Sequence, residues 1–260
     1  LIIGGAEQAG MTPEDVLEIV LVGNPVMHHL LLGIDPIELG GAPFALAIDT
    51  AVEMRASELG LNLHEGSMVY VLPCIAGHVG ADAAGVVLAE APQTRDDISL
   101  LIDVGTNAEI VLGNKDRLLA ASSPTGPAFE GAQISAGQRA APGAIERLRI
   151  DPETLEPRYS VIGSDIWSDE AGFDDAVANS GITGICGSGI IEALGEMYLS
   201  GIITAEGVID GSLASRTDRI IEDGRTFKYQ ITDTVSILQN DVRAIQLAKA
   251  ALHAGFRLLM

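Results

Sequence analysis

The sequence predicts an α/β fold. Strands alternate with helices in the first part of the chain, and the next three strands follow one another directly. Two short apolar runs, at 19–22 and 68–75, are each followed by a glycine-containing turn and a helical pattern, at 26–32 and 81–91. Strands buried on both faces that alternate with helices are typical of parallel sheets with crossover connections. The following strands are too closely spaced for crossovers, and the turn at 113–116 is a hairpin signal, so they predict a meander.

The other elements follow from periodicity and from helix-start and helix-stop residues. Thr12 and Pro13 are typical of a helix start, and Gly60 is typical of the end of a helix over 50–59. We further expect a meander at 98–104, 108–112 and 117–122, a helix start at 127–136, antiparallel strands at 145–150 and 159–162, a glycine loop at 181–189, and helices at 190–199 and 240–260.

Composition excludes several classes of function. The 260 residues carry 15 Lys and Arg against 36 Asp and Glu, a formal charge of −21, which disfavours binding to nucleic acid or to anionic membranes. No apolar run approaches the roughly 20 residues that a membrane span needs. Two cysteines cannot form a disulfide framework or ligate a four-cysteine cluster, which favours a reducing cytoplasm.

The polar stretch 92–97 marks one candidate domain boundary, between 1–93 and 94–260. The chain starts at Leu1, and its last helical pattern has no stop signal before Met260. We therefore expect strands on both sides of a longer protein to lie outside this sequence.

The strongest motif follows the first strand of the meander. Asp103 ends that strand, and Gly105, Thr106 and Asn107 form the turn before Glu109. Glycine allows close approach of the backbone to an anion, and the amides of Thr106 and Asn107 with the Thr106 hydroxyl suit phosphate oxygens. Asp103 would hold Mg²⁺ through water or orient an attacking water. The alternative is an ordinary hairpin with a satisfied turn aspartate.

A second carboxylate lies where a glycine-containing turn enters a helix. Asp82 falls in the first turn of the helix at 81–91, after Gly77 and Gly80. It is a second candidate for orienting metal or water, or simply a favourable acid at a helix start.

Two further glycine motifs precede predicted helices. Gly187, Ser188 and Gly189 offer amides to an anion or a ribose edge, or provide tight packing at a helix start. Gly126 and Glu130 line a phosphate cleft or cap a helix. The Gly187 motif matches neither a P-loop nor a dinucleotide fingerprint.

Three other features favour structural roles. His28 and His29 point to different helix faces and have no partner at metal-ligand spacing, so packed or solvated side chains are expected rather than a metal site. Cys186 is expected to be a small packed residue. The acidic tract at 165–175 is expected to be a solvated loop, with partner docking as the alternative.

Taken together, the motifs resemble the C-terminal part of the reductive activators of corrinoid proteins. That family belongs to the actin-like ATPase superfamily, with acetate and sugar kinases and heat-shock chaperone ATPases. The matching stretches are LVGNPVMHHLLLGIDP, LPCIAGHVGADAAG, LLIDVGTNAEIVLG, GPAFEGAQISAGQRAAPGAIE, GICGSGIIEAL and DVRAIQLAKAAL. The resemblance implies an actin-like ATPase (ribonuclease H-like) fold with two lobes, here incomplete at both ends. Residues 1–93 would be part of the first lobe, and 94–260 part of the second, with an inserted acidic antiparallel subdomain.

The resemblance also implies an activity. Such proteins use ATP and Mg²⁺ with a [2Fe–2S] domain to reduce Co(II) to Co(I) in a corrinoid protein of a methyltransferase partner. The cluster domain would lie outside this chain. The loop Asp103–Asn107 would be the second phosphate loop, and Asp103 the metal ligand. Small-molecule kinases share the fold and form one alternative, and a non-catalytic docking scaffold forms the other. The sequence leaves open whether the protein is a homodimer.

Overall fold

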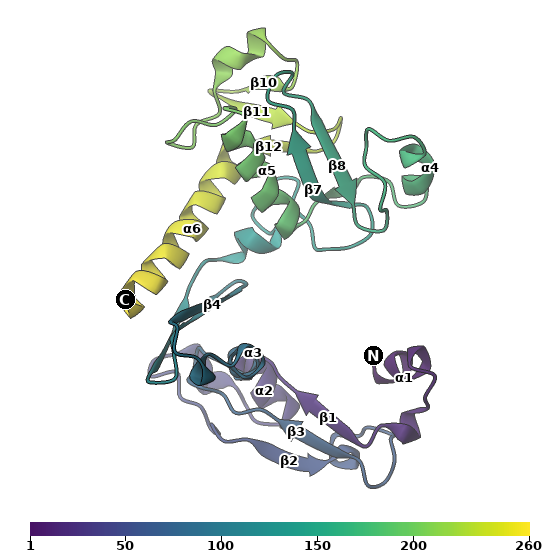
Figure 1. The fold of residues 1–260 in the computed structure, drawn as a ribbon, viewed down its shortest axis with the longest axis vertical. Coiled ribbons are helices and arrows are strands. Elements are labelled where there is room, and N and C mark those ends of the chain that lie inside the picture. Colours follow the sequence, from purple (N-terminus) through teal and green to yellow (C-terminus); the bar gives the residue numbers. More distant parts are fainter. The chain divides into compact units, whose positions relative to one another are not determined.

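The structure is a computed structural model that describes residues 1–260 (Figure 1). Its contacts divide the chain into two units. The first comprises residues 1–103, 109–122 and 255–260, and the second comprises 104–108 and 123–254. No helix in residues 1–260 is both long and apolar enough to cross a membrane.

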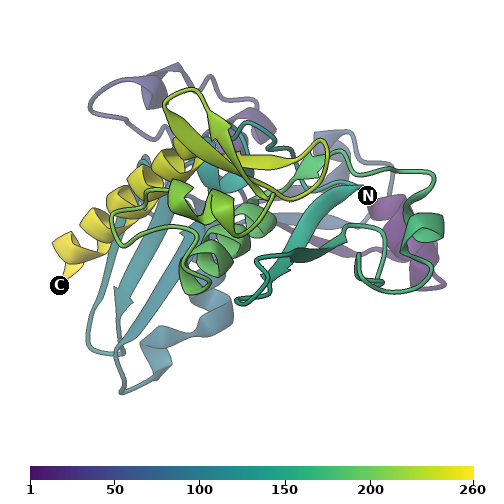
Figure 2. The ribbon, with the colours of Figure 1, turned by 90° about the horizontal axis from the view of Figure 1, so that it is seen from above.

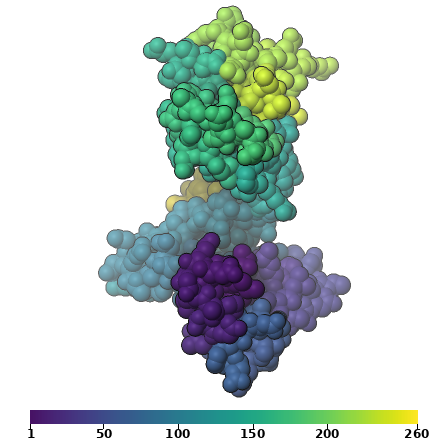
Figure 3. Space-filling view, turned by 90° about the vertical axis from the view of Figure 1, so that its right-hand side faces the viewer, coloured from purple at the N-terminus to yellow at the C-terminus, as the bar shows by residue number.

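The first unit contains a small mixed sheet in the order β1-β3-β2. Strands β1 (Glu18–Leu21) and β3 (Met68–Val71) are parallel, as the sequence predicts, and β2 (Val52–Arg55) is antiparallel to β3. Its helices are α1 (Ile2–Gln8), α2 (Pro25–Leu31) and α3 (Ala81–Glu90). Most residues of α1, purple in Figure 3, are exposed.

The predicted helix at 50–59 is wrong. Val52 and Met54 alternate with Glu53 and Arg55, and this period of two places the apolar pair against the core of the sheet. Only the short 3₁₀ helix η3 (Ala56–Leu59) is helical there. The predicted helix start at Thr12 and Pro13 leads into only a single 3₁₀ turn, η1 (Pro13–Asp15). Thr12 and Asp15 cap the start of this turn.

The predicted meander is confirmed as a sheet in the order β4-β5-β6. Its strands are β4 (Ser99–Val104), β5 (Ala108–Gly113) and β6 (Leu118–Ser123). The β5–β6 turn needs glycine, because a Cβ at Gly113 would lie 1.9 Å from the Arg117 carbonyl oxygen.

The second unit has two further sheets. One has the order β8-β7-β9, with β7 (Ala144–Ile150), β8 (Pro157–Val161) and β9 (Gly184–Ile185). The other has the order β10-β11-β12, with β10 (Ile220–Asp223), β11 (Thr226–Gln230) and β12 (Ser236–Leu238). The predicted antiparallel pair is confirmed in β7 and β8.

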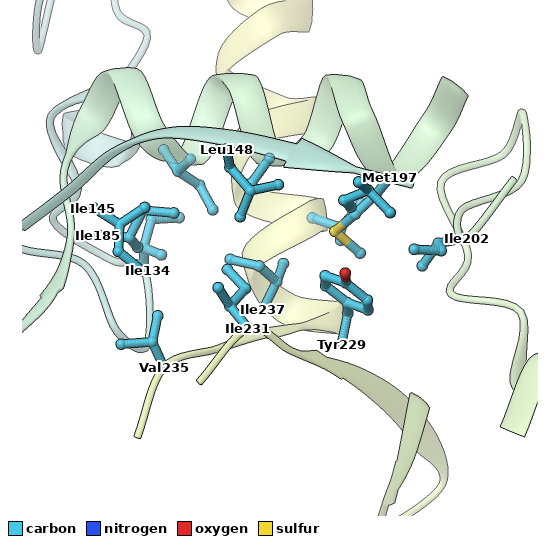
Figure 4. Packing of buried hydrophobic residues seen from close by; sticks show 14 of the residues in the cluster. Ile134, Ile145, Leu148, Ile185, Met197, Ile202, Tyr229, Ile231, Val235 and Ile237 are labelled. Carbon is cyan, nitrogen blue, oxygen red and sulfur yellow. The ribbon is translucent and has the colours of Figure 1, made fainter. Parts of the chain in front are cut away.

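The remaining α-helices are α4 (Phe173–Val177), α5 (Gly187–Leu199) and α6 (Gln239–Leu259). The chain also contains the 3₁₀ helices η2 (Ile37–Gly40), η4 (Pro92–Thr94) and η6 (Gly211–Ser215). Helix α6, yellow in Figure 2, is uninterrupted. The core of the second unit gathers side chains from β7, α5, β11 and β12, including Leu148, Met197, Tyr229 and Ile237 (Figure 4).

Two predicted helix boundaries differ from the structure. The 127–136 segment is helical only over η5 (Pro127–Glu130), because Gly131 takes a left-handed φ of 84°. Beyond it, Ser135 donates its N–H and its hydroxyl to the buried carboxylate of Asp241, at 2.8 and 2.9 Å. Helix α5 begins at Gly187 rather than at 190, so the predicted loop residues Gly187–Gly189 are its first turn.

Candidate functional site

In the second unit, the loop Gly105–Asn107 is held through its carbonyl groups. Thr125, which is 6% exposed, donates its hydroxyl to the Gly105 carbonyl at 2.7 Å and contacts that of Thr106 at 3.1 Å. The Gly126 N–H also donates to the Thr106 carbonyl, at 2.9 Å. Since these bonds anchor the loop from its buried side, the side chains of Thr106 and Asn107 stay exposed.

Glu130 meets this loop from the end of η5. The Thr106 hydroxyl donates to Glu130 Oε1 at 2.8 Å. A Cβ at Gly105 would lie 3.3 Å from the Asn107 carbonyl oxygen and 3.4 Å from Glu130 Oε1. The structure therefore brings Glu130 to the loop of Gly105, Thr106 and Asn107, although the sequence has these residues in two separate motifs.

The first turn of α5 packs against η5. A Cβ at Gly187 would lie 1.9 Å from the Phe129 carbonyl oxygen, and one at Gly189 would lie 2.3 Å from that of Ile145. These contacts bear out the packing alternative for both glycines. Ser188 Oγ lies 3.2 Å from the sulfur of the buried Cys186. A role for Gly187–Gly189 in nucleotide binding stays a prediction.

A cavity of about 690 Å³ opens in the second unit beside this group. Phe129 and Val104, the chain neighbours of Glu130 and Gly105, line part of it. The walls are mainly apolar, with Gln246 as one of the polar groups, which is typical of small-molecule sites. No sequence motif indicates this cavity, because its lining comes from segments up to 148 residues apart. Its complete lining is Val104, Phe129, Ile191, Leu194, Gly195, Tyr198, Ile203, Thr204, Ala205, Gly207, Val242, Ile245, Gln246, Lys249 and Leu252.

The two predicted catalytic carboxylates belong to the first unit and lie near a third. Asp103 is half-buried on β4, and Asp82 Oδ1 accepts the Ala83 N–H at 2.9 Å in the first turn of α3. Asp103 and Glu109 line one small cavity. The pKa of Glu109 is raised by burial and further raised by the charges of Asp82 and Asp103, although the hydroxyl of Ser122 donates to its carboxylate at 3.1 Å.

Glu109 is the residue that sequence reasoning did not assign. The available signal was a charged residue between the buried Ala108 and Ile110 of β5. A carboxylate in an apolar strand is costly unless it has partners or a task, so perturbed groups of this kind are candidates for function.

The carboxylates of residues 1–260 offer only part of a metal site. No three His, Cys, Asp or Glu side chains are grouped so that they could hold a metal ion by themselves. Mg²⁺ commonly binds through one or two carboxylates plus phosphate oxygens and water. Asp103 as a ligand of a Mg²⁺ that arrives with a nucleotide stays a prediction.

The histidine pair is packed, which is one of the two alternatives that the sequence left open. His29 is 1% exposed, its Nδ1 lies 2.9 Å from the Pro25 carbonyl oxygen, and its Nε2 accepts the Ala47 N–H at 3.0 Å. His28 is 2% exposed, and neither of its ring nitrogens has a hydrogen-bond partner. Burial, followed by the neighbouring His29, lowers the pKa of His28.

The acidic tract at 165–175 contacts β8 through Arg158. The Arg158 guanidinium lies 4.8 Å from the centre of the Trp167 ring and 3.6 Å from the Asp169 carboxylate. Docking of a partner on this tract stays a prediction.

Comparison with known families defines the class of the fold. Residues 97–260 match the family model of the C-terminal domain of RACo, the ASKHA domain, and residues 1–94 match that of the RACo middle region. The second part of the chain is thus an ASKHA domain, which confirms the predicted actin-like ATPase class. The chain belongs to the RACo family.

Individual relatives agree with this membership. A solved structure of a reductive activator for corrinoid, iron-sulfur protein matches the whole chain with a TM-score of 0.80 and 32% identity, over 40% of its own length. The corrinoid activation enzyme RamQ of Eubacterium limosum is 32% identical over 266 residues, covering 97% of this chain and 42% of that protein. The [Co(II) methylated amine-specific corrinoid protein] reductase of Methanosarcina barkeri is 34% identical over 142 residues, covering 52% of this chain and 26% of that protein.

The chain spans about two fifths of the length of the first two of these relatives and 26% of that of the third. The two family models meet between residues 94 and 97, whereas the contacts divide the chain within β4 to β6. The assignment of 1–93 and 94–260 to two lobes therefore stays a prediction.

Proposed function

We propose that this chain is the ATP-binding part of a protein that reductively activates a corrinoid protein, taking its cobalt from Co(II) to Co(I). Membership of the RACo family supports the activity. The observation that carries the nucleotide site is the Gly105–Asn107 loop, which Thr125 and Gly126 hold by its carbonyl groups. The Gly105 N–H is also engaged, since it donates to the Asn107 carbonyl at 3.1 Å. The groups left to face an anion are the N–H groups of Thr106 and Asn107 and their exposed side chains.

The predicted residues then have distinct tasks. The N–H groups and side chains of Thr106 and Asn107 would contact phosphate oxygens, Gly105 would allow their close approach, and the apolar cavity beside Phe129 would accept the base. Asp103, with Asp82 as the second candidate, would hold Mg²⁺ and orient the attacking water. Bound ATP·Mg²⁺ supplies the free energy of hydrolysis, which drives a conformational cycle toward the partner.

The electron for the cobalt must come from elsewhere in the protein. One electron converts Co(II) to Co(I), and a low-potential reductant would supply it through a [2Fe–2S] domain. The cysteines of this chain, Cys74 and Cys186, are both buried and belong to different units, so they offer no cluster site. The partner is a corrinoid protein that serves a methyltransferase.

The test uses the full-length gene product, reductant and a Co(II) corrinoid protein. We expect visible absorption of an iron–sulfur cluster and the appearance of Co(I) only when ATP and Mg²⁺ are both present. Phosphoryl transfer to an added sugar or acid by a protein without a cluster would instead establish a kinase. A protein that neither hydrolyses ATP nor reduces cobalt would be a scaffold.

Asp103→Asn tests the assigned carboxylate. It should lower ATP turnover at least tenfold, because the amide cannot replace a carboxylate toward Mg²⁺. Asp116→Asn, in the exposed turn between β5 and β6, is the matched control and should leave turnover unchanged. Equal turnover of the two variants would remove Asp103 from the site.

A further inference from the structure

The Thr106–Glu130 hydrogen bond has a consequence for any anion that binds the loop. The Thr106 hydroxyl has one proton, and that proton is donated to Glu130 Oε1 at 2.8 Å. It cannot be donated to a phosphate oxygen at the same time. The carboxylate of Glu130 thus takes the Thr106 proton that a phosphate oxygen at this loop would otherwise accept.

Backbone contacts hold this carboxylate in place. At its start, η5 is joined to the loop by the Gly126 N–H, which donates to the Thr106 carbonyl at 2.9 Å. Near its end, the Phe129 carbonyl lies against Gly187 of α5, where there is no room for even a Cβ atom. Glu130 itself is exposed, so its location follows from the backbone of η5 rather than from packing of its side chain.

We infer that Glu130 makes nucleotide binding at this loop depend on a divalent cation. A polyphosphate without a cation meets the negative charge of Glu130 and must also displace it from the Thr106 hydroxyl. A cation bound to the phosphates reduces their negative charge and attracts the carboxylate, so the same residue ceases to oppose binding. Glu130 is a positioning and specificity-determining residue here, and this inference rests on the proposed function.

Equilibrium binding of ATP to the full-length protein provides the test, once with excess Mg²⁺ and once with EDTA. Glu130→Gln keeps an oxygen that accepts the Thr106 hydroxyl but removes the charge. Glu222→Gln, an exposed change on β10 of the same unit, removes one charge elsewhere and controls for the net charge of −21. Melting temperatures equal to wild type establish that both variants fold.

We expect Glu130→Gln to tighten the binding of Mg²⁺-free ATP about tenfold, corresponding to about 1.4 kcal/mol, with a smaller effect in Mg²⁺. The ratio of Kd in EDTA to Kd in Mg²⁺ should therefore fall for this variant and stay at the wild-type value for Glu222→Gln. A purely structural role of Glu130 would change both Kd values alike.

A wild-type ratio in Glu130→Gln, or an equal change in both variants, would overturn the inference and leave the proposed function standing. If the wild-type protein binds no ATP even with Mg²⁺, the proposed function fails, and the inference fails with it.

Discussion

Gly187→Ala tests the contact that fixes η5 against α5. The added Cβ would lie 1.9 Å from the Phe129 carbonyl oxygen and 3.0 Å from its carbon. Since both atoms belong to the backbone, no side-chain rotation can relieve the clash, and η5 or α5 must move by about 1 Å. Overpacking of this kind costs about 1–3 kcal/mol, and alanine returns at most about 1 kcal/mol through helix propensity. An approach of 1.9 Å to a backbone atom puts the cost at the upper end of that range, about 3 kcal/mol, so we expect a net loss of about 2 kcal/mol.

Gly195→Ala on the same helix is the matched control. No atom lies within 4 Å of a Cβ at Gly195, so this variant should gain about 0.5–1 kcal/mol from helix propensity alone. Urea unfolding followed by the fluorescence of Trp167, the single tryptophan of the chain, reports on the second unit. The two variants should differ by about 3 kcal/mol in the free energy of unfolding.

Equal stabilities of the two variants would refute the close approach of η5 and α5. A second readout concerns the site. If η5 moves, Glu130 moves with it, so Gly187→Ala should weaken the dependence of ATP binding on Mg²⁺ in the same direction as Glu130→Gln.

Three further substitutions test buried polar groups. Tyr229→Phe removes the 3.0 Å hydrogen bond to the Leu155 carbonyl and should lower stability in urea unfolding by about 1–3 kcal/mol, because that carbonyl stays buried. Burial lowers the pKa of His28 from 6.5, so the unfolded chain binds the proton more readily than the folded chain. Stability therefore falls as the pH drops below about 6.5. In urea unfolding between about pH 5 and 7, the stability of His28→Leu should depend less on pH than that of the wild type. Burial raises the pKa of Glu109 from 4.5, so the stability of the protein falls as the pH rises through that raised value. Glu109→Gln removes the titrating group and should therefore unfold at a higher urea concentration than the wild type at about pH 7.

The sequence predicts those parts of the fold in which periodicity is clear. The apolar run at 19–22 and the three meander strands carry enough β-pattern to locate β1 and β4–β6 to within one residue. The helix predicted at 50–59 is wrong for a local reason. Four residues of strand followed by one 3₁₀ turn fit a helical pattern as well as an alternating one, and only pairing with β3 decides between them.

The candidate site is predictable as a set of motifs but not as an arrangement. Thr106 and Glu130 are 24 residues apart, and Phe129 and Gly187 are 58 apart, so no local pattern indicates that they meet. Glu109 could be noticed as a charge in an apolar strand. Its relation to Asp82, however, depends on how α3 packs against the meander, which no spacing in the sequence encodes.

The glycines around η5 act through two different physical effects, and both constrain the backbone that carries the exposed carboxylate of Glu130. Gly126 provides a left-handed φ of 73° at a position with no atom near its missing Cβ, so any other residue there would be opposed by backbone strain. Gly187 is helical, and a side chain there is opposed by collision with Phe129. The first glycine sets the direction in which η5 leaves the loop, and the second sets its distance from α5. Because an exposed side chain gains little from packing, these two backbone constraints are what place Glu130 beside Thr106. Substitutions at either glycine should therefore alter the cation dependence of nucleotide binding without touching a group that contacts the nucleotide.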